Sequence, residues 1–328
     1  SPGESNVIDY FQMESSGDAA DFGDLVSTRE KPSACGSTIR GIIGGGQDAP
    51  AASNIVEYIV FGTLGNTTNF GDLTVARENL SADGNATRGI FGAGATSPGR
   101  TDVIDYITMA SAGDATDFGN LAATIQIHNG ASSNCHSGLE VSDQRPSVNY
   151  MPGSGRALFS KGADDVSAIT MININTLGNA TVFGDAVAGN GHNSSSTGGS
   201  TTRGFMLGSG ATGDADKNTY TYIELATQGN AATFGDMTTG RYSGSGVSSS
   251  TRCCAYGGYD DGLQDVIDFV TIASIGNASD FGDLTAARYE MGATINSPTR
   301  GIAHGGSTLP ARVNIIDYIT IASAGDAT

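Results

Sequence analysis

Two of the four histidines lie beside a cysteine in one short segment, where His128, Cys135 and His136 could bind a metal. Zinc needs three or four nitrogen or sulfur ligands at a recognisable spacing. The neighbouring sequence offers no such further ligands, so we expect no metal site. The segment belongs to an expected surface insertion at about 126–154, because the stretch from Leu121 to Arg156 is about 20 residues longer than its counterpart from Leu73 to Arg88. Long insertions in repeat proteins often bind partners, and the binding residues expected here are His128, His136, Asp143, Arg145 and Tyr150. An inert loop is the alternative.

Glycine clusters and acidic turns are candidates for phosphate and calcium binding. Runs such as GIIGGG recur along the chain, and no helix is predicted to follow them, as a phosphate-binding loop requires. Segments such as GDATDFG are rich in acids, but they lack the ligand spacing and closing Glu of an EF-hand. Since Asp, Asn and Gly are also typical of tight turns, we expect no cofactor, with calcium as the alternative.

Arginine and carboxylate residues occur together in some repeats and are lost together in others. Arginine follows a Phe-Gly-Asp-Leu or Phe-Gly-Asp-Met motif by four residues in four repeats, and the same four repeats keep an acid in a later strand. The other two repeats hold Ile125 with Thr170 and Asn190 with Thr221. The Arg fork can bond a carboxylate twice. We therefore expect partly buried ion pairs from the first strand of a repeat to its third: Arg29–Glu57, Arg77–Asp105, Arg241–Asp268 and Arg288–Asp317.

The elements that must position these residues form a tandem repeat. A Phe-Gly pair recurs at Phe22, Phe70, Phe118, Phe183, Phe234 and Phe281. Each repeat contains four short segments rich in Ile, Val, Thr and Tyr and bounded by Gly, Asn or Asp, which predicts four strands. The first is expected after a Phe-Gly-Asp-Leu turn, the second is a glycine-terminated run after an arginine, the third is aromatic (VIDYI), and the fourth precedes the next Phe-Gly. Four strands in a period of roughly 48 residues are typical of a β-propeller blade.

The strand arithmetic favours one closed ring. The pattern predicts 25 strands, one more than six four-stranded blades need, so we expect six blades with a surplus aromatic strand. The alternative is seven blades, two of them incomplete, or a longer parent chain. Residues 1–20 and 309–328 are copies of one segment, and pairing strands from both ends would remove open sheet edges. We therefore expect a single domain over 1–328. Asp9 and Asp317 are copies of one position, and we expect Arg288 to bond Asp317.

Composition narrows the class of partner. The 328 residues carry a formal net charge of −18, which disfavours nucleic acid because phosphate is repelled. Apolar runs fall short of the roughly 20 residues of a membrane helix, so no membrane insertion is expected.

The repeat carries a resemblance to known families. Its glycine-terminated run, aromatic strand and Leu-x-x-x-Arg resemble the kelch repeat, with Phe-Gly where kelch usually carries tryptophan. Segments such as TRGIFGAG, DVIDYITMAS and SDFGDLTAAR more closely resemble repeats of virion structural and tail-fibre-type proteins of marine bacteriophages. That resemblance implies a kelch-like β-propeller on the exterior of a virion, at its tail or capsid surface.

The function expected from these observations is non-enzymatic. A virion structural or adhesion module would present loops to a host glycan, a host receptor or other virion proteins, and a homo-oligomer fits such a role. One alternative is a carbohydrate-active enzyme, which needs convergent carboxylates, whereas most acids here recur with the repeat as structural residues do. A generic protein-interaction propeller is the other alternative.

Overall fold

The computed structural model describes residues 5–12, 15, 17–48, 50–96, 99–125, 130–133, 156–160, 168–187, 196–200, 202–207, 218–292, 295–297 and 299–328. Every regular element in these ranges is a β-strand, which confirms the all-β prediction. No helix among them is long and apolar enough to cross a membrane. The chain forms two compact units, the first comprising 1–162 with 168–183 and the second 163–167 with 184–328.

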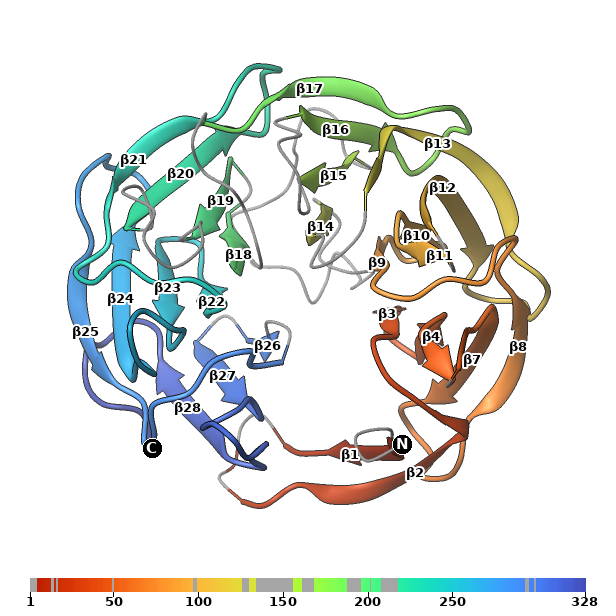
Figure 1. Ribbon diagram of the computed structural model, residues 1–328, viewed down its shortest axis with the longest axis horizontal. Helices are drawn as coiled ribbons and strands as arrows, with labels where there is room; N and C mark the ends of the chain where they lie inside the picture. The colour runs from red at the N-terminus through yellow and green to blue at the C-terminus, as the bar shows by residue number, and fades with distance from the viewer. Residues whose placement is uncertain are drawn as a thin grey trace. The chain divides into compact units, whose positions relative to one another are not determined.

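Unit 1 holds a strand pair and a series of antiparallel sheets (Figure 1). The pair is β1 (Ser5–Tyr10) and β2 (Ala20–Arg29). The next sheet runs in the order β3 (Ser33–Gly36), β4 (Arg40–Gly44), β7 (Ile55–Val60) and β8 (Thr68–Asp72), with a small hairpin of β5 (Gln47–Asp48) and β6 (Ala51–Ala52). It is followed by β9 (Ser81–Gly84), β10 (Arg88–Gly92), β12 (Gly99–Thr108) and β13 (Thr116–Ile125), with β11 (Ala95–Thr96) paired to β12. The last sheet is β14 (Gly130–Ser133), β15 (Arg156–Ser160), β16 (Ala168–Asn173) and β17 (Thr181–Asp185), whose final two residues belong to unit 2.

Unit 2 repeats the same sheet order. Its first sheet is β18 (Ser196–Gly199), β19 (Arg203–Leu207), β20 (Thr219–Glu224) and β21 (Ala232–Asp236). The second is β22 (Ser245–Ser248), β23 (Arg252–Tyr256), β24 (Val266–Thr271) and β25 (Ser279–Asp283). The third has β26 (Ile295–Asn296), β27 (Arg300–His304) and β28 (Ile316–Thr320). Apart from the two-residue strands β5, β6 and β11, the described strands follow the expected four-strand order.

The first strand of each repeat begins later than the sequence suggests. We expected it directly after Phe-Gly-Asp-Leu, yet β9 begins at Ser81, and Arg77 lies in the irregular segment before it. Arg241 and Arg288 also precede their strands, and Arg29 ends β2. The expected position of these arginines on the first strand is therefore wrong.

The Phe-Gly pair is a β-bulge, not the expected turn. In the β12–β13 pairing, Ile104 opposes Gly119 and Asp105 opposes Asp117, so Phe118 is the extra residue. The same register shift occurs opposite the acidic position in β1–β2, β7–β8 and β24–β25. Bulges redirect side chains, and Phe118 is buried with 3% exposure. The bulge explains why glycine follows, since Gly119 has a φ of 143°.

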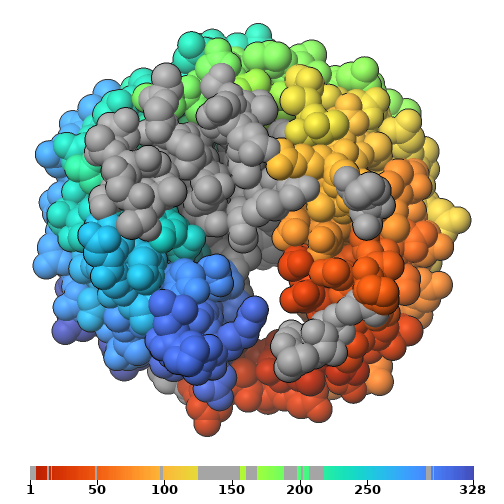
Figure 2. All heavy atoms as spheres, viewed as in Figure 1, coloured from red at the N-terminus to blue at the C-terminus, as the bar shows by residue number. Residues whose placement is uncertain are grey.

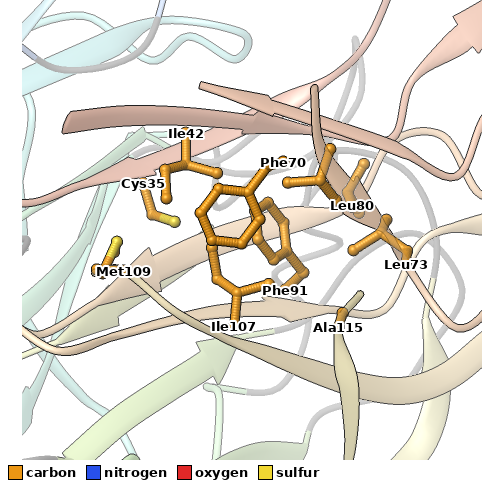
Figure 3. Packing of buried hydrophobic residues seen from close by; sticks show 10 residues of the cluster. Cys35, Ile42, Phe70, Leu73, Leu80, Phe91, Ile107, Met109 and Ala115 are labelled. Carbon is orange, nitrogen blue, oxygen red and sulfur yellow. The ribbon is translucent and has the colours of Figure 1, made fainter. Parts of the chain in front are cut away.

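The hydrophobic cores lie between consecutive sheets. Figure 3 shows one such core, where Cys35 and Ile42 of β3 and β4 pack with Phe91 and Ile107 of β10 and β12. Equivalent clusters join the next sheets of unit 1 and, separately, the sheets of unit 2. Within each unit, the sheets joined by these clusters therefore bury apolar faces against their neighbours in the chain, as is typical of a repeat protein.

Candidate functional site

All four predicted ion pairs are present and buried. Arg77–Asp105, Arg241–Asp268 and Arg288–Asp317 have nitrogen–oxygen distances of 2.9, 2.7 and 2.9 Å, and Arg29 also contacts Glu57. Each guanidinium donates further hydrogen bonds to backbone carbonyl oxygens, such as that of Phe91 to Arg77 at 3.1 Å. Burial lowers the pKa of Arg77, and the Asp105 carboxylate opposes that shift. Arg77, Arg241 and Arg288 therefore join the irregular segment to the second and third strands, and Arg29 joins the end of β2 to β7.

Each carboxylate also accepts hydrogen bonds from the segment that carries its arginine. The backbone N–H and the hydroxyl of Thr74 donate to Asp105 at 3.1 and 2.6 Å. Thr285 makes the same two bonds to Asp317 at the same distances, and the Thr238 hydroxyl donates to Asp268. The threonines were not predicted from the sequence. The sequence does contain a signal for them: the two repeats that lack the acid also lack this threonine and hold Ala122 and Val187 at its position.

The Glu57 repeat reaches the same hydrogen bonding with different residues. Val26 stands at the threonine position. Its backbone N–H still donates to Glu57 at 3.0 Å, but valine has no hydroxyl to donate the second hydrogen bond. The missing donor is supplied by the hydroxyl of Thr67. Alanine holds the Thr67 position in the other repeats, as at Ala115 and Ala327. Glutamate reaches this hydroxyl because its side chain is one methylene longer than that of aspartate.

A second set of arginines joins consecutive repeats. Arg40, at the start of β4, lies 4.7 Å from the ring centroid of Tyr58 and donates a 3.0 Å hydrogen bond to the carbonyl of Met109 in the next repeat. Arg88 repeats both contacts in unit 1, and Arg203 and Arg252 repeat them in unit 2. Their role was not predicted, although the recurring pair of arginine and aromatic residue was visible.

A pair of glycines brings neighbouring repeats into close contact. The N–H of Gly178 donates to the carbonyl of Phe118 at 2.9 Å, and a Cβ on Gly119 would lie 2.6 Å from the Gly178 carbonyl oxygen. The N–H of Asn120 donates in turn to the Asn179 side chain at 3.1 Å. We call this arrangement, a Phe-Gly-Asp/Asn segment with the Gly-Asn/Asp segment of the next repeat, the glycine lock. It recurs at Phe22–Asp24 with Gly65–Thr67, Phe70–Asp72 with Gly113–Ala115, Phe234–Asp236 with Gly276–Ala278, and Phe281–Asp283 with Gly325–Ala327.

The binding residues expected in the insertion lie outside the described residues: His128, His136, Asp143, Arg145 and Tyr150. One boundary of the insertion at 126–154 needs correction. Residues Gly130–Ser133 form β14, which pairs with β15 as the first strand of its sheet. The extra residues therefore fall at 134–155, between β14 and β15. The corresponding connection between β3 and β4 consists only of residues 37–39.

Cysteines and acids in the described residues offer little chemistry. Cys35, Cys253 and Cys254 are buried free thiols. Burial raises the pKa of Cys254 to about 12, so the thiol stays protonated near neutral pH and is a poor nucleophile. Within the described ranges, no group of three or more His, Cys, Asp or Glu side chains could hold a metal.

The irregular segments form a backbone ladder with the loops after the second strands. In unit 2, Tyr242 and Tyr259 exchange hydrogen bonds of 3.1 and 2.9 Å, and Tyr289 and Ser307 exchange bonds of 3.2 and 2.9 Å. The residue after Tyr242 or Tyr289 has a positive φ, 54° at Ser243 and 51° at Glu290. Unit 1 makes the same bridges with Glu30 to Gln47 and Glu78 to Ala95. We call these eight residues, four in each unit, the loop ladder.

Side chains on the loop ladder differ between the units although the backbone bridges match. In unit 1 the Lys31 ammonium donates to Gln47 and Glu78 at 3.0 Å each. In unit 2 the three tyrosine rings form a row, with centroids 5.8 Å apart from Tyr242 to Tyr259 and from Tyr259 to Tyr289. The fold therefore fixes the ladder but leaves its side chains free to vary.

No protein-family model matches the chain, and no curated protein matches it.

Proposed function

We propose that this chain is a non-enzymatic structural or adhesion module on the exterior of a bacteriophage virion, of the tail-fibre or capsid-surface type. The observation that carries the proposal is the repeat itself, whose Arg-Gly run, VIDYI strand and Asp-Phe-Gly-Asp-Leu segment resemble repeats of marine phage virion proteins. Buried ion pairs and glycine locks occupy most of these recurring residues, which supports a rigid scaffold carrying variable loops. Its partners would be other virion proteins or a host surface glycan or receptor.

The fold belonging to this proposal is a kelch-like β-propeller with six blades. Support comes from the recurring four-strand order and from the two incomplete sets, β1–β2 and β26–β28, which hold one strand more than a blade needs. Seven blades remain the alternative. Small-angle X-ray scattering tests compactness, because a compact chain of this length has a radius of gyration of about 20 Å. An open array would give a clearly larger value.

Virion proteomics and immunogold microscopy test the location. Antibodies against the recombinant chain should label the outside of intact particles of the virus that encodes it, and its peptides should be recovered from purified particles. The recombinant chain should also compete with particles for adsorption to host cells if it is an adhesin. Absence from particles would overturn the proposal. Release of sugars from host polysaccharide by the purified chain would favour the enzyme instead.

A further inference from the structure

The tyrosine row of unit 2 is the part of the loop ladder that the fold does not explain. Tyr242, Tyr259 and Tyr289 are half-buried, whereas the matching ladder positions of unit 1 are Glu30, Gln47 and Glu78. The backbone bridges are the same in both units, so aromatic rings are not needed to build them. Solvent-facing aromatic side chains that the fold does not require are typical of binding surfaces.

Hydrogen bonds within the protein fix the loop that carries Tyr259 without any ligand. Tyr259 is bridged on one side to Tyr242 and on the other to Leu263, and Gly258 donates to the Arg288 carbonyl at 2.9 Å. Gln264 fastens the same loop through its side chain, which donates to the carbonyls of Asp260 and Gly262. Rings fixed in this way lose little conformational entropy when they bind.

The row offers ring surfaces and hydroxyl groups but no free strand edge. The backbone groups of Tyr242 and Tyr289 that a peptide strand would use are bonded to Tyr259 and Ser307. Addition of a peptide strand is therefore blocked. Among the described residues, the hydroxyls of Tyr259 and Tyr289 have no hydrogen-bond partner, so they can donate to and accept from a ligand.

The residues adjacent to the row in the sequence are acidic, which disfavours anionic ligands, and the exposed Arg312 lies one bridge beyond Tyr289, opposite Ser307. Asp260 and Asp261 follow Tyr259, and Glu290 follows Tyr289; Asp261 and Glu290 are exposed. The chain as a whole carries a formal net charge of −18. Carboxylates accept hydrogen bonds from sugar hydroxyls but repel sulfate, phosphate and sialic acid. In Figure 2 the colours from teal to blue mark the surface that the described residues of unit 2 present in that view.

We propose that Tyr242, Tyr259 and Tyr289 bind a neutral oligosaccharide, whose apolar sugar faces pack on the ring row while its hydroxyls bond the hydroxyls of Tyr259 and Tyr289 and the exposed carboxylates of Asp261 and Glu290. Consecutive rings lie 5.8 Å apart and are tilted by 57° to one another, so they form a row of separate ring surfaces instead of a cage, which suits an extended chain of sugars. This inference rests on the proposed adhesive function and names the class of ligand.

The test uses the full chain on an array of neutral, sialylated and sulfated oligosaccharides. Neutral glycans should be bound, and the Y242A/Y259A/Y289A variant should bind them at least tenfold more weakly. The Y259F/Y289F variant keeps the rings and should lose a smaller part of the affinity. A Q47A/E78A variant changes the matching ladder of unit 1 and should bind like the wild type. Because the chain has no tryptophan, tyrosine emission provides a second readout of binding.

The inference would be overturned if no neutral glycan were bound, if anionic glycans were preferred, or if the triple alanine variant bound unchanged with native circular dichroism. Host adsorption that survives the triple variant would remove the glycan site and leave the virion role standing. Glycan binding by a chain that is absent from virions would support the saccharide site and refute the virion role. Binding of a host protein instead of any glycan would identify the row as a protein-binding surface and refute the saccharide.

Discussion

Arg252, at the start of β23, donates a 3.1 Å hydrogen bond to the carbonyl oxygen of Ile321, one repeat further along the chain. Its guanidinium also lies 4.5 Å from the ring centroid of Phe269 in its own sheet. One side chain thus packs within its own repeat and bonds the next. This contact between repeats is independent of hydrophobic packing.

Replacing Arg252 with lysine should lower the free energy of unfolding by about 1–3 kcal/mol, because the compact ammonium cannot both stack on Phe269 and reach the carbonyl. Urea unfolding followed by circular dichroism measures the change. R312K is the control, since Arg312 is exposed. Equal unfolding midpoints for the two variants would show that Arg252 does not join the repeats.

Asp105→Asn should lower the free energy of unfolding by about 3–5 kcal/mol, because it leaves the buried Arg77 charge without its counter-charge. The triple variant T74A/R77I/D105T copies Ala122, Ile125 and Thr170 from a repeat without the pair, and it should lose less. Chemical unfolding of the two variants measures both. Asp9→Asn, at an exposed copy of the position, should change stability by less than about 0.5 kcal/mol. A large loss in Asp9→Asn would mean that Asp9 has a buried partner.

Thr67→Ala should destabilise the chain by about 1–2 kcal/mol, because Glu57 loses a hydroxyl donor in a buried site. The V26T/E57D/T67A variant transfers the hydroxyl to the position used by Thr74 and should recover that loss. Thermal unfolding of the two variants, with E57D alone as the reference, measures the recovery. A triple variant less stable than Thr67→Ala would refute the exchange of donors.

Gly119→Ala should lower the free energy of unfolding by about 3–5 kcal/mol, because Gly119 has a φ of 143° and its new Cβ would clash with the Gly178 carbonyl. Gly62→Ala is the matched control, since nothing lies within 4 Å of a Cβ there. Soluble yield and melting temperature should separate the two variants. Similar melting temperatures would show that the glycine lock tolerates a side chain.

Replacing residues 134–155 with the short connection found at 37–39 should leave the melting temperature unchanged and weaken binding to a partner that uses the insertion. Removal of 128–150 should instead lower it, because that deletion includes β14. Melting curves and adsorption competition of both deletions test this. Equal stability would mean that β14 contributes nothing to its sheet.

Features that recur in the sequence could be predicted, and features that depend on exact backbone register could not. The Arg77–Asp105 pair was visible because both residues are lost together elsewhere in the chain. The sequence favours a turn at Phe118 instead of a bulge, because a Gly after a bulky residue also marks turns and only strand pairing separates the two. The sequence does not predict β14, because Gly-Ala-Ser-Ser lacks the branched and aromatic residues of a typical strand.

The tyrosine row was missed for a different reason. Its members come from two repeats, and Tyr259 meets Tyr242 and Tyr289 only through the backbone ladder. A single repeat therefore carries no signal of the row.

The segment from Gly65 to Asp72 takes part in two glycine locks at once. Its first residues join Phe22–Asp24 in the preceding repeat, and its last residues receive Gly113–Ala115 from the following one. One end of such a segment therefore bonds the preceding repeat and the other end bonds the following repeat, and the same residue types make both contacts. Gene duplication can add or remove whole repeats while every junction is still made from the same parts. Relatives of different length should thus keep these glycines while their ladder residues diverge.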